Sequence, residues 1–327
     1  MRTRVTDLLG IRHPILLGGM AGGTDARLVA AVSRAGGLGI LGASTLSSEA
    51  IEAEVAMIRE VTPMPFGVNL LLWSSAAKVE AVLQQQPAVL STAWGDPRPF
   101  VEMAHEAGAL VIHMTHDVEG ARLAARAGVD VVVAQGSEGG GHIGIQSTIT
   151  LVPQVVDAVG DIPVVAAGDI GDGRGLAAAL ALGADGVMMG TRFLATREAP
   201  IPDGWKRAIL DAQGGETVRS PIIDLANEAP WPEPAAVRAI RNAFLERWLG
   251  REDEVRRLGR EIGRGLAQAR RDDDRQEMGL MAGEVVGLIH DLPSAADVVE
   301  RVVREAEGLL PQLAAKASGR AVPKADR

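Results

Sequence analysis

One histidine of this chain, His142, lies in a glycine-rich stretch, QGSEGGGHIG, at residues 135–144. Imidazole has an ordinary pKa near neutrality, so it can take up a proton or donate a hydrogen bond to a developing anion. Gly136 and Gly141 remove side chains where the backbone could lie against a flat ligand. We therefore predict that His142 is a catalytic residue at the edge of a binding site. A loop histidine without a role is the alternative.

Two further glycine turns have the pattern of a phosphate site. Each follows an apolar run: Gly168 stands in AAGDIG, and Gly190 stands in MMGTRF, where Thr191 comes next. Glycine lets backbone N–H groups approach an anion closely, and a threonine hydroxyl adds a donor. In a (β/α)₈ barrel, the loops after the last two strands commonly form such a site. The alternative is that these glycines only permit tight turns.

Two strand-like segments carry residues that could contact the same ligand. LLGGMAGG places Met20 in a glycine-rich turn, and GVNLLL places Asn69 inside an apolar run. A buried amide needs hydrogen-bond partners, and the edge of a flavin ring would supply them. An internal hydrogen bond would satisfy Asn69 equally well, and Met20 could be a core residue.

Other polar residues near these motifs have several interpretations. Glu138 could orient His142 or lie at the rim of the pocket, whereas Asp172 has the position of a helix-start residue. His113 ends an apolar run and could face the pocket, while His116 is expected in a loop. No His, Asp or Glu pattern resembles a metal site, and we predict none.

The elements that must position these residues alternate between apolar runs and amphipathic segments. The runs show little polar alternation, which is typical of parallel strands covered by helices. A closed (β/α)₈ barrel fits eight such runs better than an open sheet does, and no GxGxxG turn follows the first one. The runs are residues 14–18, 38–43, 66–72, 88–94, 109–115, 130–136, 163–168 and 186–191.

The pattern changes after the eighth run. We predict a (β/α)₈ barrel from residues 1–199 and 281–316, interrupted by a mostly helical insertion at 200–280. This insertion could cover the barrel mouth or pack against a neighbour. Residues 317–327 are short, polar and terminal, and we expect them to be disordered.

Composition excludes several classes of function. The chain has 327 residues, 33 Lys and Arg against 42 Asp and Glu, and a formal net charge of −9. That balance argues against nucleic-acid or membrane-surface binding, both of which require a basic face. Cysteine is absent, which excludes thiolate catalysis and disulfides. Because we find neither a signal peptide nor a membrane span, we expect a cytoplasmic protein.

In order and spacing, these motifs resemble the nitronate monooxygenase family over residues 8–310. The resemblance rests on PILLGGMAGGTD, PFGVNLLL, AQGSEGGGHIG and AAGDIGDGRGLAAALALGADGVMMGTRFLAT. It implies a barrel with FMN, with His142 as the catalytic residue. It also implies that Met20, Asn69 and Gln135 contact the isoalloxazine ring and that Gly168, Gly190 and Thr191 hold the phosphate. Gly136, Gly141 and Asp169 complete the expected cofactor site.

Members of this family oxidise alkyl nitronates with O₂ to a carbonyl compound and nitrite. The related flavin-type enoyl-acyl-carrier-protein reductases share most of these motifs and reduce enoyl thioesters with NAD(P)H. A non-catalytic flavin-binding barrel is a third interpretation. The resemblance therefore implies a small-molecule substrate with O₂ as the partners, and allows a homodimer.

Three departures from the family pattern bear on the site. Asp169 stands where a second glycine is usual. We expect it to adopt a left-handed backbone, to point away from the phosphate and to cap the next helix. Some relatives have a lysine at the end of strand five, where this chain reads His113-Met114-Thr115. Glu284 occupies a position that is often glutamine.

Overall fold

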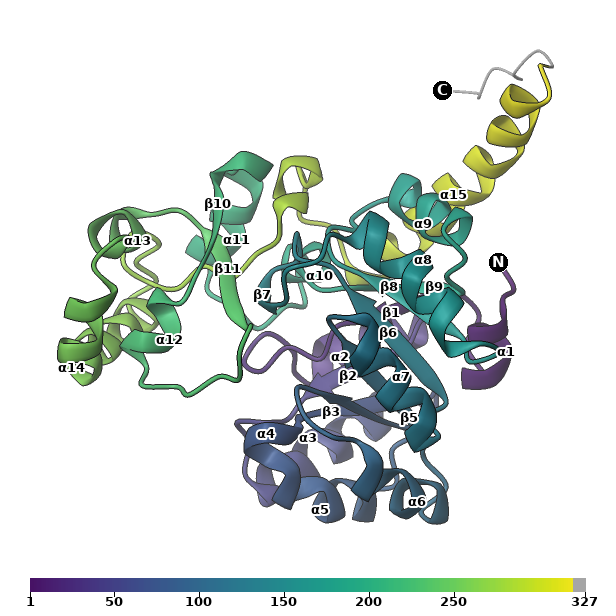
Figure 1. Ribbon diagram of the computed structural model, residues 1–327, viewed down its shortest axis with the longest axis horizontal. Helices are drawn as coiled ribbons and strands as arrows, with labels where there is room; N and C mark the ends of the chain where they lie inside the picture. The colour runs from purple at the N-terminus through teal and green to yellow at the C-terminus, as the bar shows by residue number, and fades with distance from the viewer. Residues whose placement is uncertain (320–327) are drawn as a thin grey trace.

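The computed structural model describes residues 1–319, and its centre is a closed parallel barrel (Figure 1). The sheet order is β1-β9-β8-β6-β5-β4-β3-β2, and a parallel bridge between Leu16 and Leu38 joins its two ends. The predicted barrel is thus confirmed over the open sheet, and each predicted run contains one strand. The strands are β1 (Ile15–Leu17), β2 (Gly39–Gly42), β3 (Phe66–Leu71), β4 (Val89–Ala93), β5 (Leu110–Thr115), β6 (Val131–Gln135), β8 (Val164–Ala167) and β9 (Gly186–Met189).

Helices cover the outside of the barrel. Several begin at a side chain that accepts a hydrogen bond from the first turn, such as Asp25, Ser47 and Asp117. The helices of this layer are α2 (Ala26–Arg34), α3 (Ser48–Val61), α4 (Leu72–Ser75), α5 (Val79–Gln84), α6 (Arg98–Glu106), α7 (Val118–Ala127), α8 (Thr148–Val159), α9 (Gly173–Ala181), α10 (Thr191–Leu194) and α15 (Ala295–Ala317), with the short 3₁₀ helix η1 (Ala76–Lys78). In contrast, α1 (Arg4–Leu9) packs Val5 and Leu9 against the side chains inside the barrel.

Each strand is buried on both faces, which explains its near-continuous apolar sequence. Leu16, Val133 and Met188 pack with one another inside the barrel. Their neighbours in sequence, such as Leu17 and Val132, pack against the helices. Because side chains alternate along a strand, this pattern also decides which polar residues point into the barrel.

A segment between β9 and α15 forms a unit at one side of the barrel, drawn in green in Figure 1. It packs around its own core, which includes Ile222, Val237, Phe244 and Val255. Its elements are α11 (Asp203–Asp211), η2 (Gly214–Glu216), β10 (Thr217–Ser220), α12 (Ile222–Ala226), β11 (Ala236–Ile240), α13 (Ala243–Trp248) and α14 (Glu252–Arg271), and η3 (Glu284–Leu288) follows.

The insertion is joined to the barrel by an antiparallel sheet of order β10-β11-β7. Its third strand, β7 (Gly141–Ile143), comes from the barrel loop after β6, and Val237 pairs with His142. The mostly helical insertion after the last barrel strand is therefore present, and it also contains β-structure that we did not predict. No helix within residues 1–319 is both long and apolar enough to span a membrane. The predicted disordered tail, 317–327, lies outside the described residues from residue 320 onward.

We expect Phe244→Ala to loosen the insertion while the barrel stays folded. Phe244 is 3% exposed in the separate core of the insertion, so its truncation should cost about 3–5 kcal/mol locally. Hydrogen exchange should become faster in the insertion helices and stay unchanged in the barrel strands. Leu8→Ala, at a side chain that is 39% exposed, is the control. Uniformly faster exchange in both parts would contradict a separate core.

Candidate active site

The two predicted phosphate turns lie side by side at the carboxyl edge of the barrel. Gly168 follows β8 and Gly190 follows β9, and these strands are neighbours in register, with Ala167 opposite Met188. A third segment packs across both turns. The Gly283 N–H donates to Thr191 Oγ1 at 3.0 Å, and the Val285 N–H donates to Asp169 Oδ1 at 2.9 Å. The site therefore includes residues 283–285 as well as the two predicted turns.

The backbone at this edge has the features of an anion cradle. Gly168 has a φ of 102°, and a Cβ there would lie 2.8 Å from Thr148 Oγ1 and 3.0 Å from the Gly136 carbonyl oxygen. A Cβ at Gly139 would lie 3.3 Å from the Gly168 Cα. Within residues 1–319, the backbone N–H groups of Thr191 and Arg192 have no hydrogen-bond partner. Unpaired N–H groups beside a glycine turn are suited to an anion.

Three side chains expected at a flavin ring lie around the same mouth. Gln135 shares the inward face of β6 with Val131 and Val133, and its buried Oε1 has no partner among the described residues. Met20 lies next to Gly190, where an added Cβ would be 3.2 Å from its Sδ. The unpaired acceptor and the open glycine turn fit a ring whose edge carries hydrogen-bond donors.

Asn69 also points inward but already has protein partners. Its Nδ2 donates to the Gly19 carbonyl oxygen at 3.2 Å, and its Oδ1 accepts from Ser91 Oγ at 3.0 Å. A Cβ at Gly19 would lie 2.4 Å from the Asn69 Cβ, so the amide packs directly beneath the first βα turn. Its internal hydrogen bonds therefore position the backbone beside Met20.

His142 is held by the insertion. Its place on β7 differs from the glycine-rich loop we expected, because pairing with β11 orders this segment. The ring Nε2 lies 2.7 Å from Oδ1 of Asp224, a residue of α12 that is only 7% exposed. The sequence did not point to Asp224, which stands in a segment without recognisable chemistry, PIIDLAN.

Glu138 does not orient His142, contrary to one interpretation of the sequence. Its carboxylate accepts hydrogen bonds from the backbone N–H and the hydroxyl of Thr148, at 2.9 and 3.0 Å. It therefore caps the start of α8, where a carboxylate is stabilised by free N–H groups. Asp224 takes the orienting position that we considered for Glu138.

The Asp224 contact defines which ring nitrogen of His142 can accept a proton. An ionised carboxylate only accepts hydrogen bonds, so Nε2 must carry the proton that lies between the two residues. In the neutral ring, Nδ1 then has a free lone pair and can act as a base. A carboxylate on the opposite nitrogen also stabilises the imidazolium that forms.

Aromatic side chains that we did not single out cover the same region. Trp231, from the insertion, stacks on His142 with ring centroids 3.3 Å apart and planes 14° apart. Trp73 lies 5.0 Å from Trp231, and Trp94 stacks on His116 at 3.8 Å. Trp94 and His116 come directly after β4 and β5, and Trp73 comes two residues after β3, so these side chains lie at the carboxyl edge of the barrel.

The other two histidines of this region are neutral. His113 is 4% exposed, shares the outward face of β5 with Val111 and lies 2.8 Å from Thr92 Oγ1. It faces the helices, so the expectation that it lies in the pocket is wrong. Burial lowers the pKa of His113 to about 4 and that of His116 to about 3.

Asp169 has the left-handed backbone we predicted, with a φ of 57°. It does not cap the next helix, because Asp172 does so through the N–H groups of Arg174 and Gly175. The Asp169 carboxyl group instead accepts from Val285. Burial, with Glu284 and Glu138 nearby, raises its pKa to about 7.

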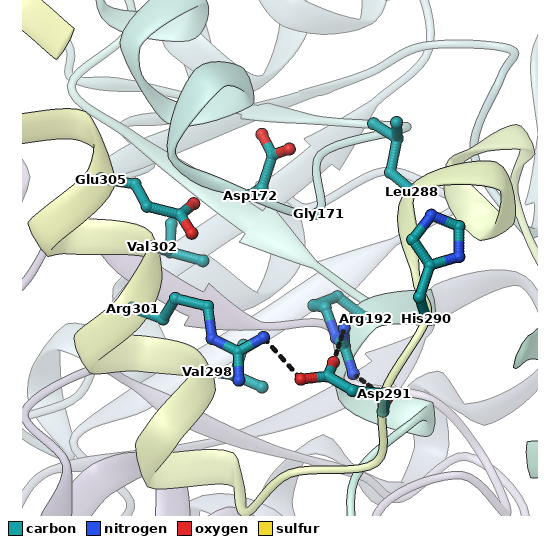
Figure 2. A pocket seen from close by; sticks show the side chains of 10 residues that line it. All are labelled: Gly171, Asp172, Arg192, Leu288, His290, Asp291, Val298, Arg301, Val302 and Glu305. Carbon is teal, nitrogen blue, oxygen red and sulfur yellow. Dashed lines mark hydrogen bonds and ion pairs between the residues drawn. The ribbon is translucent and has the colours of Figure 1, made fainter. Parts of the chain in front are cut away.

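Behind the turn after β9 is a cavity of about 290 Å³ between α9 and α15 (Figure 2). Arg192 and Arg301 both bind Asp291 there, at 3.0 and 2.6 Å. Arg192 also donates to the carbonyl oxygens of Ala195 and Asp291. These contacts fix the backbone that follows the turn after β9. His142 does not line this cavity, which is therefore separate from the proposed catalytic residue. In the described part of the chain, no cluster of three potential metal ligands occurs.

A closed parallel barrel with two glycine turns and an oriented histidine at its carboxyl edge has the form of a (β/α)₈-barrel enzyme, whose active site lies at that edge. The sequence model of the family described as nitronate monooxygenase matches residues 2–77 and 73–305. The chain belongs to the nitronate monooxygenase family. This relationship makes it an oxidoreductase and supports a flavin as its cofactor.

Three relatives illustrate the range of this group. A Mycobacterium tuberculosis protein named (3aS,4S,5R,7aS)-5-hydroxy-7a-methyl-1-oxo-octahydro-1H-indene-4-carboxyl-CoA dehydrogenase is 37% identical, covering 94% of this chain and 96% of its own. FabK from Thermotoga maritima has 36% identity and a TM-score of 0.89, covering 97% of this chain and 99% of its own. Nitroalkane oxidase from Streptomyces ansochromogenes has 30% identity and a TM-score of 0.82, covering 94% and 99%.

We expect Gly168→Val to lose most of the flavin bound at purification. A side chain with a φ of 102° is strained by about 1–3 kcal/mol, and its Cβ would press on Thr148 and Gly136. Such a cost corresponds to about tenfold or more in affinity. The measurement is the ratio of flavin to protein absorbance. Gly265→Ala, where a Cβ meets nothing within 4 Å, is the control. Full flavin content in Gly168→Val would place the cofactor elsewhere.

Proposed function

We propose that this protein is an FMN-dependent oxidoreductase that oxidises an alkyl nitronate or nitroalkane with O₂ to a carbonyl compound and nitrite. The observation that carries the proposal is the 2.7 Å contact between His142 and Asp224, which lies at the same barrel edge as the Gly168 and Gly190 turns. Membership of the nitronate monooxygenase family and similarity to a nitroalkane oxidase support the substrate class.

Different residues at this edge would contact different parts of the cofactor. Gly168, Gly190 and Thr191 would hold the phosphate of FMN, while Met20 and Gln135 would contact the ring. Asn69 would act through the backbone that it supports, and Gly136 and Gly141 would keep the approach free of side chains. When bound, FMN accepts the electrons that the substrate loses.

His142 would remove a proton from the carbon next to the nitro group. Nδ1 takes that proton, because Nε2 is already protonated and bound to Asp224. The resulting imidazolium is stabilised by the Asp224 carboxylate, and it can later release the proton to water. With a nitronate, whose carbon is already deprotonated, the protonated ring would donate a hydrogen bond to a substrate oxygen. Trp231 would cover one face of the imidazole ring during this transfer.

A second candidate is dehydrogenation of a coenzyme A thioester. It is favoured by the relative that carries the carboxyl-CoA dehydrogenase name, which is 37% identical over nearly the whole chain. The carbon next to a thioester carbonyl also carries an acidic proton, so the same base would serve. The half-buried Met114 stands near the end of β5, where some relatives have lysine, so this position would supply no cation to stabilise the charge that develops on the flavin when it is reduced.

We expect His142→Ala to keep its flavin and to lose turnover by about 10²- to 10⁴-fold, because the base is gone. Asp224→Asn should retain flavin and lose at least about tenfold, since Asn no longer selects the required tautomer or stabilises the imidazolium. Turnover is followed as oxygen uptake and nitrite release with a nitroalkane and its nitronate.

His105→Ala is the matched control for these variants. His105 contacts Asp130 at 2.8 Å in a second, exposed His–Asp pair, whose residues precede β5 and β6 and so lie at the amino edge of the barrel, opposite the site. This variant should keep wild-type turnover. Wild-type turnover in His142→Ala would show that another residue is the base.

One set of assays separates the candidates. Nitrite release in air supports nitronate oxidation. Anaerobic bleaching of the flavin by an acyl-CoA panel, without nitrite release from nitronates, would replace it with thioester dehydrogenation. Bleaching by NADH alone would favour the enoyl reductase alternative. A purified protein that neither contains FMN nor binds it when added would contradict the proposal. A protein that binds FMN but catalyses none of these reactions would favour the non-catalytic flavin-binding barrel.

A further inference from the structure

Asp169 places a carboxyl group against residues 283–285, the segment that packs across both turns of the cradle. Its backbone follows Gly168 directly, and its Oδ1 accepts from the Val285 N–H at 2.9 Å. That oxygen lies against Gly283, where an added Cβ would be only 2.5 Å away. Since the Gly283 N–H donates to Thr191 Oγ1, Asp169 and Thr191 flank the same short backbone segment.

The surroundings of Asp169 do not compensate a negative charge. The nearby acidic groups Glu284 and Glu138 raise the pKa of Asp169, and among the described residues Arg238 is the one basic side chain that lowers it. Arg238 is already engaged, because its guanidinium binds Glu284 at 3.0 Å, the Ser137 carbonyl oxygen at 3.0 Å and Thr217 Oγ1 at 3.1 Å. Ionised Asp169 would therefore add a third carboxylate to an acidic cluster.

A phosphate in the cradle would make this conflict worse. An ionised carboxylate and a phosphate dianion repel each other strongly when little water lies between them. Within residues 1–319, Oδ2 of Asp169 has no hydrogen-bond partner, whereas Oδ1 is held by Val285. A proton on Oδ2 would remove the repulsion and supply a donor. Burial already raises the pKa of this carboxyl group to about 7, so the proton is available near neutrality.

We propose that Asp169 binds the FMN phosphate as a neutral carboxylic acid, which donates from Oδ2 to a phosphate oxygen while Oδ1 keeps the Val285 N–H. FMN binding then takes up one proton from solvent, and FMN release returns it. This inference rests on the proposed FMN cofactor. It makes cofactor retention depend on pH. It also gives a function to Asp169, which stands where the family usually has a second glycine.

The direction of the effect follows from proton linkage. The acid is neutral in both states at low pH, so FMN affinity is then highest. Above the pKa of the free protein, each FMN that binds must first protonate Asp169, and affinity falls by up to about tenfold per pH unit. The phosphate itself becomes fully dianionic above about pH 6, which would strengthen binding as pH rises. Rising pH therefore weakens FMN binding through Asp169 and strengthens it through the phosphate.

The test is the dissociation constant of FMN, measured by flavin fluorescence quenching on flavin-stripped full-length protein between pH 6.5 and 8.5. For the wild type we expect the constant to rise about fivefold or more. Asp169→Asn keeps a neutral donor and tolerates the left-handed backbone, so its constant should not rise. Glu284→Gln, which removes a neighbouring acid but not Asp169, should keep a clear rise. Riboflavin, which lacks the phosphate, should bind both proteins without this pH dependence.

Calorimetry of the wild type provides a second readout that does not depend on any variant folding. FMN titrations at pH 8 in buffers of different ionisation enthalpy should show net uptake of protons. The proposal is overturned if wild type and Asp169→Asn have the same pH dependence, or if no protons are taken up. If neither protein binds FMN at any pH, the proposed function itself fails. If FMN binds tightly and independently of pH, only this inference fails.

Discussion

The hydrogen bond between Asp224 and His142 is the contact on which the site depends. His142 comes from the barrel and Asp224 from the insertion, so the bond exists only when the two parts are assembled. Pairing of β7 with β11 brings the two residues together, and Arg238 strengthens the junction through Ser137. The insertion therefore supplies Asp224, the group that determines the tautomer of His142.

The remainder of the site solves an electrostatic problem. The chain carries a net charge of −9, and acidic groups lie beside the cradle. Membership of its family nevertheless supports a flavin as the cofactor. Backbone N–H groups of Thr191 and its neighbour can attract an anion locally, without a positive field over the whole protein. Arg192 contributes indirectly, since its contacts with Asp291 hold the turn in place.

The barrel and its carboxyl edge were predictable from the sequence, because both depend on local patterns. Buried strands give uninterrupted apolar runs, and glycine turns follow them at fixed places such as Gly168 and Gly190. The partners of His142 were not predictable. Asp224 and Trp231 are separated from it by more than eighty residues, and no periodicity links them. Glu138 was the nearest acid in sequence, but the start of α8 competes for its carboxylate. Only the pairing of β7 with β11 identifies the correct partner.

Nuclear magnetic resonance measures directly which ring nitrogen of His142 carries the proton. The purified flavoprotein would be labelled with nitrogen-15 histidine, and the His142 signals would be assigned by their absence in His142→Ala. At about pH 8, where an ordinary imidazole is neutral, the account predicts a proton on Nε2 and a bare Nδ1. A proton on Nδ1, with Nε2 unprotonated, would contradict it.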